Sequence, residues 1–380
     1  MHVVVLGAGY AGLSLVRRLE SRLPPAVDVT LVNDGAEHVL IHEAHRAIRR
    51  PALADAISVS IPDVLDRTEF VNARVDSVEF DAGRAVLDDG EALSWDYGAV
   101  CLGSETEYYG IEGLREHATP MKSLADAATI REGFRSVREA GGRAVVGGAG
   151  LSGVQVAGEL TALAREEEFA VPEEVEVVLL ERFDGVAPNF PANFRRAVHD
   201  ELLERDVDVR TGTAVERVGP ERVVTEEGEL RYDQLIWTGG ITGPAAADGN
   251  RPTVRADLRA ADRTLALGDA ARIVDADGEP VPASASAAIR EAKTAAENLS
   301  RLVEADRSES VEAFRPRLSQ YRFDVPGWIV SIGEGTVAQV GSTVLRGSAA
   351  KAAKASVGAG YLTSIGAARN AGSLAEEELR

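Results

Sequence analysis

The chain has 380 residues, which is enough for two or three domains and a full hydrophobic core. Its apolar runs are strand-sized, and none approaches the ~20 residues needed to span a bilayer. The net charge of −20 argues against a nucleic-acid partner, because neutralising phosphates requires a basic face. The single cysteine, Cys101, excludes an internal disulfide, a dithiol redox centre and a cysteine-based metal site.

Acidic residues are abundant, and only four of the 41 basic residues are lysines. This composition is typical of a halophilic protein, since molar salt screens the self-repulsion of a large net charge. The alternative is a GC-rich genome that favours arginine codons. His38, His42 and His45 have helical spacing, but no convincing set of carboxylates accompanies them. We therefore expect no metal site.

The first predicted element is a strand over residues 3–6, followed by a GxGxxG turn and a helix through residue 19. The first glycine permits the tight turn, the second lets the backbone approach a pyrophosphate, and the third lets helix and strand pack closely. The helix N-terminus then offers free N–H groups to the phosphates. The glycines are Gly7, Gly9 and Gly12. A strand over 27–34 follows, and Asn33 and Asp34 stand where an acidic side chain usually holds a ribose hydroxyl.

A second strand, glycine turn and helix begin at residue 144, with Gly148, Gly150 and Gly153 in the turn. The next predicted strand, 175–181, ends in Glu181. A carboxylate at this position repels a 2′-phosphate and favours NADH over NADPH, although the adjacent Arg182 weakens that discrimination. The alternative is a duplicated domain that no longer binds its ligand.

One chain that binds two dinucleotides most naturally moves a hydride between them, and the usual pair is a nicotinamide and a flavin. Strands within 97–114 and 234–241 end in glycine turns. A third strand, within 263–273, delivers Gly268 and Asp269. An aspartate at such a strand end can take a ribityl hydroxyl.

The segments GAGYAGL, LGSETEYYGI, GGAGLSGVQVAGEL, IWTGG, LALGDAA and GWIVSIGEGTVAQVG occur in this order along the chain. In this order the sequence resembles the type II NADH:quinone dehydrogenases over residues 1–370. The resemblance implies FAD on the first domain, NADH on the second, and electron transfer to a membrane quinone without proton pumping. It also implies a peripheral place in the respiratory chain, at the cytoplasmic face of the cell membrane.

The implied fold is α/β, with two Rossmann-like dinucleotide-binding domains, the second inserted in the first, and a small C-terminal α+β segment. We expect an FAD-binding domain over residues 1–110 and 255–320. We expect an NADH-binding domain over 111–254, and a C-terminal region on the membrane and quinone side over 321–380.

The resemblance assigns roles residue by residue. The implied FAD contacts are Gly7, Gly9, Gly12, Asn33, Asp34, Val75, Gly103, Gly268 and Asp269. The implied NADH contacts are Gly148, Gly150, Gly153, Glu181, Gly239 and Gly240. Glu159 matches the acidic residue near the nicotinamide–flavin contact, where it would orient the nicotinamide or relay a proton. Its alternative role is a helix carboxylate that caps a neighbouring loop. The histidine segment resembles the part of the family that covers the flavin.

The chain departs from the family on the quinone side of the flavin. The family often carries a glutamine-rich AQxAxQQ segment, and the corresponding residues here are 282–292, where Ser286 replaces the first glutamine and Arg290-Glu291 the pair. The implied quinone-side residues are Ser286, Arg290 and Lys351. This departure leaves the identity of the acceptor open.

Residues 335–375 contain no Asp or Glu, but they carry Arg346, Lys351, Lys354 and Arg369. A basic segment with interspersed apolar residues fits a surface that docks on anionic lipid headgroups. The alternative is a buried C-terminal subdomain or a homodimer interface, where acids are scarce because they would be buried. Burial alone would not enrich lysine, which favours the membrane surface.

Three other functions remain open. A sulfide:quinone oxidoreductase or a disulfide reductase would need a cysteine pair, so only a relative without the cysteines fits. A soluble FAD/NADH reductase would pass electrons to a protein or another acceptor. A non-catalytic NADH sensor would bind both dinucleotides without turnover.

Overall fold

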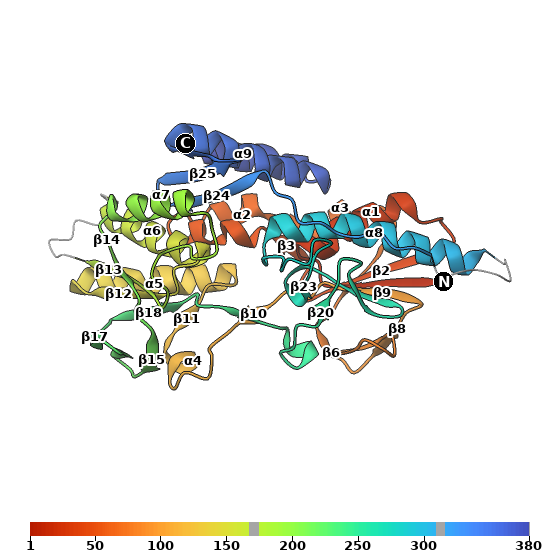
Figure 1. The fold of residues 1–380 in the computed structure, drawn as a ribbon, viewed down its shortest axis with the longest axis horizontal. Helices are drawn as coiled ribbons and strands as arrows, with labels where there is room; N and C mark the ends of the chain where they lie inside the picture. The colour runs from red at the N-terminus through yellow and green to blue at the C-terminus, as the bar shows by residue number, and fades with distance from the viewer. Residues whose placement is uncertain (167–174, 309–315, 380) are drawn as a thin grey trace.

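The computed structural model describes residues 1–166, 175–308 and 316–379. Two α/β units lie side by side, and the C-terminal helices pack along one side of both (Figure 1). The expected α/β fold with two Rossmann-type units is confirmed. Residues 167–174 of the predicted NADH-binding domain and 309–315 of the predicted FAD-binding domain lie outside the described residues.

The first unit is built on a six-stranded sheet with the order β21-β22-β9-β1-β2-β5. Its strands are parallel except for β21, which runs antiparallel to β22. The valines at positions 3, 4 and 5 are fully buried, because helices and loops cover both faces of the sheet. The strands are β1 (His2–Leu6), β2 (Asp28–Asn33), β5 (Glu69–Asn72), β9 (Tyr97–Val100), β21 (Arg259–Ala261) and β22 (Thr264–Ala266).

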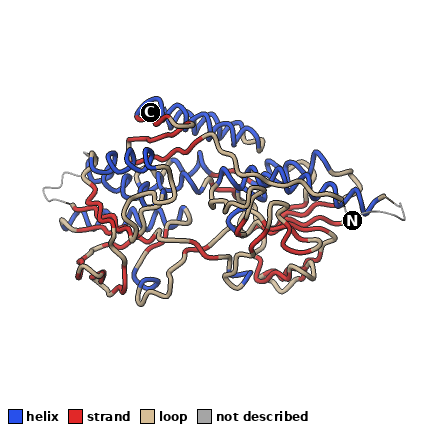
Figure 2. The backbone as a smooth tube through the Cα atoms, viewed as in Figure 1, coloured by secondary structure: helices blue, strands red, loops and turns tan. Residues whose placement is uncertain are grey.

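Two long helices of this unit, α1 (Tyr10–Arg22) and α8 (Ala285–Arg307), pack against each other, although residues 23–284 separate them in sequence. Together they join the N-terminal strands to the part of the chain that returns after the second unit. An antiparallel sheet of β6 (Val75–Glu79), β7 (Arg84–Leu87) and β8 (Ala92–Ser94) lies on the opposite side of the unit (Figure 2).

The second unit repeats this plan. Its five parallel strands have the order β11-β18-β12-β13-β14. They are β11 (Thr119–Pro120), β12 (Arg143–Gly147), β13 (Glu176–Glu181), β14 (Val207–Thr211) and β18 (Gln234–Trp237). Helices α5 (Leu124–Ala140), α6 (Leu151–Arg165) and α7 (Ala192–Leu203) belong to this unit, as does an antiparallel sheet of β15 (Val215–Val218), β16 (Arg222–Thr225) and β17 (Gly228–Arg231).

The chain crosses between the units twice, and the two crossings pair as antiparallel strands β10 (Glu105–Thr106) and β19 (Ile241–Thr242). The shorter elements surround the sheets: β3 (Glu37–Val39), η1 (Ile41–Ile48), α2 (Leu53–Ile57), β4 (Ser58–Ser60), α3 (Ile61–Val64), α4 (Leu114–His117), η2 (Ala245–Ala247), β20 (Thr253–Val254), η3 (Gly268–Ala270) and β23 (Arg272–Ile273).

The C-terminal region is a three-stranded antiparallel sheet followed by two packed helices. Its elements are β24 (Gly327–Ile332), β25 (Gly335–Val340), β26 (Thr343–Arg346), α9 (Gly347–Ser364) and α10 (Ala368–Leu379). Strand β24 packs against α6, and α10 packs against α2, so the region contacts both units. Within the described residues, no helix combines the length and apolar character needed to cross a membrane.

Candidate functional site

The two glycine turns have the same backbone geometry. Gly7 and Gly148 follow β1 and β12 with φ values of +95° and +93°, a region that L side chains rarely adopt. A Cβ on Gly12 would lie 1.8 Å from the Gly7 carbonyl oxygen, and a Cβ on Gly153 would lie 1.8 Å from that of Gly148. Each helix thus packs on its own turn at a distance that only glycine permits.

In both units, the last side chain of the next strand is hydrogen-bonded to the glycine turn. The Ala8 N–H donates to Oδ1 of Asn33 at 2.8 Å, and the Ala149 N–H donates to Oε2 of Glu181 at 2.8 Å. The other oxygen of Glu181 accepts from the Phe183 N–H at 3.0 Å. The strand-end residues predicted from the sequence therefore do lie against the glycine turns.

The middle glycine of each turn faces open space. A Cβ built on Gly9 or Gly150 would meet no atom within 4 Å, and each residue precedes the first turn of a helix. This is the position at which a pyrophosphate approaches the backbone and the N–H groups of the helix N-terminus. Both turns therefore fit a dinucleotide.

The switch point of each sheet locates the rest of each site. The switch point is the place where successive connections leave a strand toward opposite sides of the sheet. In the first unit, β1 lies between β2 and β9; in the second unit, β12 lies between β13 and β18. Ligands of open α/β sheets bind at the carboxyl ends of the strands at such a point. Gly103 follows β9 and Gly239 and Gly240 follow β18, so these predicted residues lie at that edge.

The remaining predicted FAD residues gather after β22. Gly268 and Asp269 begin η3, and the Gly268 N–H donates to Oε2 of Glu291 at 2.7 Å. Burial raises the pKa of Glu291 to about 7, and the charge of Asp269 adds to the shift, whereas the Gly268 bond and Arg251 oppose it. The sequence pattern alone assigns Glu291 no role at the flavin, although Glu291 occupies the last glutamine position of the family's AQxAxQQ segment.

Asp34 and Val75 have different surroundings. Asp34 is exposed, and its carbonyl accepts from Nδ2 of Asn33, so Asn33 is the residue that contacts the turn. Val75 is buried at the beginning of β6, where it pairs with Leu87.

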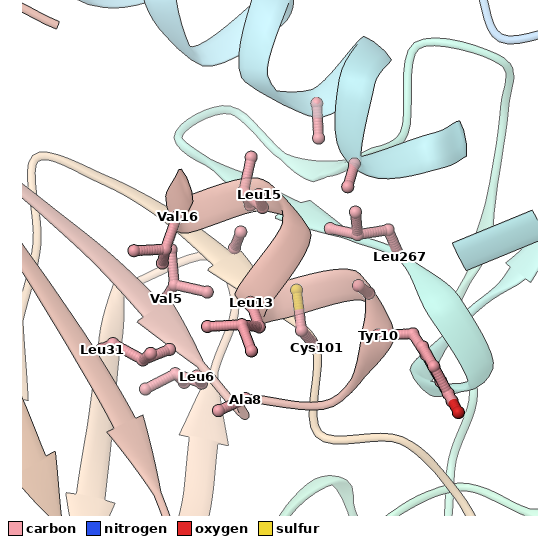
Figure 3. Close-up of a cluster of buried hydrophobic side chains, with 14 of the residues drawn as sticks. Val5, Leu6, Ala8, Tyr10, Leu13, Leu15, Val16, Leu31, Cys101 and Leu267 are labelled. Carbon is pink, nitrogen blue, oxygen red and sulfur yellow. The ribbon is translucent and has the colours of Figure 1, made fainter. Parts of the chain in front are cut away.

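Side chains from distant segments meet Tyr10, directly after the first turn. The ring of Tyr10 is buried and contacts Tyr361 of α9, and its hydroxyl is hydrogen-bonded to Nδ1 of His42. Figure 3 shows the ring of Tyr10 directed away from the apolar cluster that contains Leu13 and Leu6. Cys101 lies beside α1 in the same view, and burial raises the pKa of its thiol far above the usual range.

The second turn has an open rim. Tyr109 is 51% exposed, and its hydroxyl donates to the Gly239 carbonyl at 3.0 Å. The guanidinium of Arg182 lies 4.6 Å from the ring centre of Phe183, which is also exposed, and 5.6 Å from that of Tyr109. Exposed aromatic side chains therefore border the second turn.

Glu159 lies between the two units, with 1% of its surface exposed. Its Oε2 accepts from Nε of Arg49 at 2.8 Å, and Oε1 is buried with no hydrogen-bond partner among the described residues. Burial raises the pKa of Glu159, and Arg49 opposes that shift. No local pattern in the sequence points to Arg49, because 110 residues separate the two partners.

A second buried charge cluster joins η1 to the C-terminal helices. Nζ of Lys354 lies 2.7 Å from Oε2 of Glu43 and 2.9 Å from Oε1 of Glu378, and Arg46 contacts both carboxylates. Although burial raises the pKa of Glu43, the charges of Lys354, His42 and Arg46 bring it well below its usual value. Arg346 is also paired, with Glu201 and Glu204.

This cluster corrects one inference from the sequence. The lysines in residues 335–375 predict an exposed basic face, but Lys354 is 7% exposed and is paired with two buried acids. The acids belong to η1 and to the end of α10, outside the acid-free segment. Lys351 is half-buried and Arg369 is exposed, so the basic surface is smaller than the composition indicates.

The histidines with helical spacing do not share one helix. His38 is on β3, whereas His42 and His45 are on η1. Nδ1 of His38 lies 2.9 Å from the Ala8 carbonyl oxygen and Nε2 lies 2.9 Å from the Tyr361 hydroxyl, so this ring joins the first turn to α9. Burial lowers the pKa of His38 to about 4, which leaves it neutral near pH 7.

Two of the predicted quinone-side residues are hydrogen-bonded to each other. Nη1 of Arg290 donates to the Ser286 hydroxyl and carbonyl, one turn earlier on α8. Lys351 is on α9, and no hydrogen bond or ion pair joins it to Ser286 or Arg290 within the described part of the chain.

Comparison with known proteins agrees with this geometry. The chain is 26% identical to the type II NADH:quinone oxidoreductase of Staphylococcus aureus, over 82% of this chain and 84% of that protein. This relative confirms the resemblance seen in the sequence. The fold matches NDH2 from Plasmodium falciparum in complex with NADH, with a TM-score of 0.80, 15% identity and coverage of 100% and 97%.

A second fold match is the sulfide:quinone oxidoreductase of Aquifex aeolicus, with a TM-score of 0.77, 19% identity and coverage of 97% and 92%. At these identities, the two solved structures establish the fold alone. The model of the pyridine nucleotide-disulphide oxidoreductase family matches residues 1–292, well over half of the chain, and the chain therefore belongs to that family.

Proposed function

We propose that this chain is an FAD-dependent NADH dehydrogenase that delivers electrons to a quinone without pumping protons. The observation that carries the proposal is the presence of two equivalent glycine turns, each with an open middle glycine and a strand-end side chain bonded to the turn. The first continues into Tyr10, whose buried ring contacts His42 and Tyr361, and its middle glycine is exposed. The second has the exposed rim of Tyr109 and Phe183, as a substrate that binds and leaves requires.

The proposed roles follow the two turns. Bound FAD supplies the redox chemistry, since it can take a hydride from NADH and pass electrons to an acceptor. Gly9 and Gly150 let the backbone approach the two pyrophosphates, and Asn33 and Glu181 hold the adjoining ribose groups. Glu159 orients the nicotinamide from the junction of the units.

The acceptor is inferred from chemistry and from relatives. Cys101 is the only cysteine, is buried, and has a raised thiol pKa, so the chain has no dithiol to pass electrons to a disulfide. A quinone is the acceptor named for the Staphylococcus relative. The hydrogen-bonded Ser286–Arg290 pair stands where the family has glutamines, so a different acceptor is the alternative to test.

The decisive experiment is anaerobic stopped-flow of the FAD-loaded protein in molar salt, mixed first with NADH and then with a soluble quinone. Rapid bleaching of the flavin by NADH, followed by rapid recovery with quinone, is the expected result. Bleaching without recovery would assign the second half-reaction to another acceptor. A protein that cannot be loaded with FAD would contradict the proposal.

The proposal includes peripheral contact with the cytoplasmic face of the membrane through residues 335–375. The exposed face of α9 carries no charged side chain and includes Val357, which is 62% exposed, and Val340 beside the helix is also exposed. Because Lys354 and Arg346 are already paired, we expect the apolar part of this contact to outweigh the electrostatic part.

Flotation with vesicles that contain anionic lipid tests this contact. Val357→Glu on the exposed face of α9 should reduce co-flotation. Val175 packs against the core of the second unit, so Val175→Glu would also alter packing and is not a suitable control. Leu203→Glu, at an exposed position on α7, is the matched control and should float like the unmodified protein. Equal flotation of both variants would contradict contact through α9.

Three finer assignments belong to the same proposal. The domain boundaries are 1–110 with 255–320 for FAD, 111–254 for NADH, and 321–380 for the membrane side. Adaptation to molar salt is supported by the net charge of −20, and unfolding at several salt concentrations tests it. A homodimer is the alternative use of the α9 face, and light scattering in molar salt distinguishes it from a monomer.

A further inference from the structure

Lys122 lies where the two units meet. It falls between β11 and α5, and the preceding Met121 packs against the hydrophobic cores of both units. Its backbone N–H donates to Oδ2 of Asp126 at 2.8 Å, in the first turn of α5. The backbone of this segment is therefore fixed at the junction by helix capping and by packing.

The side chain of Lys122 reaches into the first unit. Its Nζ donates to Oγ of Ser104 at 2.9 Å, and Oγ of Ser104 donates to Oδ2 of Asp269 at 3.1 Å. Ser104 follows β9 and Asp269 follows β22, which are adjacent strands of the parallel sheet. The ammonium group thus lies at the same carboxyl edge as the first glycine turn, on the side away from Asn33.

The position is half-buried and charged on several sides. Burial lowers the pKa of Lys122, while the charges of Asp269 and Glu105 oppose that shift and Arg251 adds to it. Arg251 itself donates to the carbonyls of Asp269 and Ala271. Arg251 therefore bonds the backbone of Asp269, and the carboxylate of Asp269 accepts from Ser104 at the edge of the sheet.

The choice of lysine is itself informative, because only four of the 41 basic residues are lysines. Lysine carries its charge on one compact ammonium group at the end of a flexible chain. Lys293, by contrast, is exposed on α8, with no hydrogen bond or ion pair in the described part of the chain.

We propose that Lys122 is a positioning residue of the FAD site that sets the redox potential of the bound cofactor. The inference rests on the proposed function. A dinucleotide whose adenosine lies beside Asn33 and whose pyrophosphate lies at Gly9 extends its other half along β9 and β22, past Ser104 and Asp269. Lys122 is linked to both. A fixed positive charge there favours the reduced cofactor, which carries more negative charge than the oxidised form.

The test measures the midpoint potential of the bound FAD by anaerobic equilibrium titration against a reference dye. Lys122→Met should lower the potential by at least about 30 mV, a tenfold change in the two-electron equilibrium. Lys122→Arg keeps the charge and should change that equilibrium less than threefold. Lys293→Met is the matched control and should leave the potential unchanged.

A second variant keeps the inference testable if Lys122→Met fails to fold or to hold FAD. Asp269→Asn removes the negative partner and should raise the potential. A lowered or unchanged potential in Asp269→Asn, or an unchanged potential in FAD-loaded Lys122→Met, would overturn the inference. If the unmodified protein binds FAD and NADH bleaches it, these results bear on Lys122 alone. If it cannot be loaded with FAD, the proposed function fails instead.

Discussion

Nε of Arg49 donates to Oε2 of Glu159 at 2.8 Å across the junction of the two units, and the side chains are 6% and 1% exposed. Arg49 follows η1 in the first unit, whereas Glu159 is on α6 in the second. The pair ties the segment beside the first glycine turn to the helix that begins at the second. Burial raises the pKa of Glu159, and Arg49 opposes that shift without cancelling it.

We expect Arg49→Leu to destabilise the fold by about 3–5 kcal/mol, because it leaves a buried carboxylate without its partner. The free energy of unfolding by urea at fixed salt measures this loss. The double variant Arg49→Leu/Glu159→Leu should recover much of it, since neither charge then remains. Arg222→Leu, which removes one partner of the exposed Arg222–Glu229 pair, is the control and should cost far less. Equal losses in both single variants would show that the buried pair has no special weight.

Lys354→Met tests the charge cluster between η1 and the C-terminal helices. Without the lysine, Arg46 is left to pair with both Glu43 and Glu378, and we expect a loss of about 3–5 kcal/mol in the free energy of unfolding. Buried pairs are screened far less than exposed ones, so the loss should be similar at low and molar salt. Lys351→Met, on the same helix and without an ion pair among the described residues, is the control.

Limited proteolysis gives a second readout of Lys354→Met. If the cluster holds α9 and α10 against η1, the variant should release C-terminal fragments earlier than the Lys351→Met control. A Lys354→Met protein with unchanged stability and unchanged cleavage would contradict this role for the cluster.

Glu181→Gln tests the reading of the second site. The amide keeps one acceptor oxygen for the Ala149 or Phe183 N–H but removes the charge that repels a 2′-phosphate. The ratio of kcat/KM for NADH to that for NADPH should fall roughly tenfold, which equals about 1.4 kcal/mol. Glu176→Gln, at the beginning of the same strand, is the control for a general change of charge. An unchanged ratio in Glu181→Gln would mean that another residue reads the ribose.

The glycine turns and the strand ends could be predicted from the sequence, because each depends on only a few neighbouring residues. A positive φ at Gly7 and Gly148 and the absence of a Cβ at Gly12 and Gly153 are such requirements. Strand-end residues such as Glu181 follow from the same pattern, since each parallel strand brings its last residue to the edge of the sheet. Both glycine turns and their bonded partners were therefore identified.

Contacts between distant segments could not be predicted in this way. Arg49 meets Glu159 across 110 residues, and Lys354 meets Glu43 across 311. No local sequence pattern reveals such a pairing. The composition of residues 335–375 therefore predicted a charged surface, whereas in the fold Lys354 is paired with buried acids from other segments. The scarcity of lysine was the one available signal for these contacts. Lys122 and Lys354 both form polar contacts where regions of the chain meet.

Glu291 gives a prediction for the pH dependence of stability. Burial raises its pKa from 4.5 to about 7 in the folded chain. The folded state therefore binds this proton more tightly than the unfolded state, and its contribution to stability is lost as the pH rises from about 4.5 to about 7. The shift of about 2.5 pH units corresponds to about 3 kcal/mol.

Glu291→Gln should remove this loss. Its amide oxygen can still accept from the Gly268 N–H, but the side chain no longer ionises. Between pH 4.5 and 7, at constant salt, the stability of the variant should therefore fall less steeply than that of the unmodified protein. Glu304→Gln, at an exposed position on the same helix, should leave the slope unchanged. Parallel curves for Glu291→Gln and the unmodified protein would mean that Glu291 ionises at its ordinary pKa, which would place water beside its carboxylate.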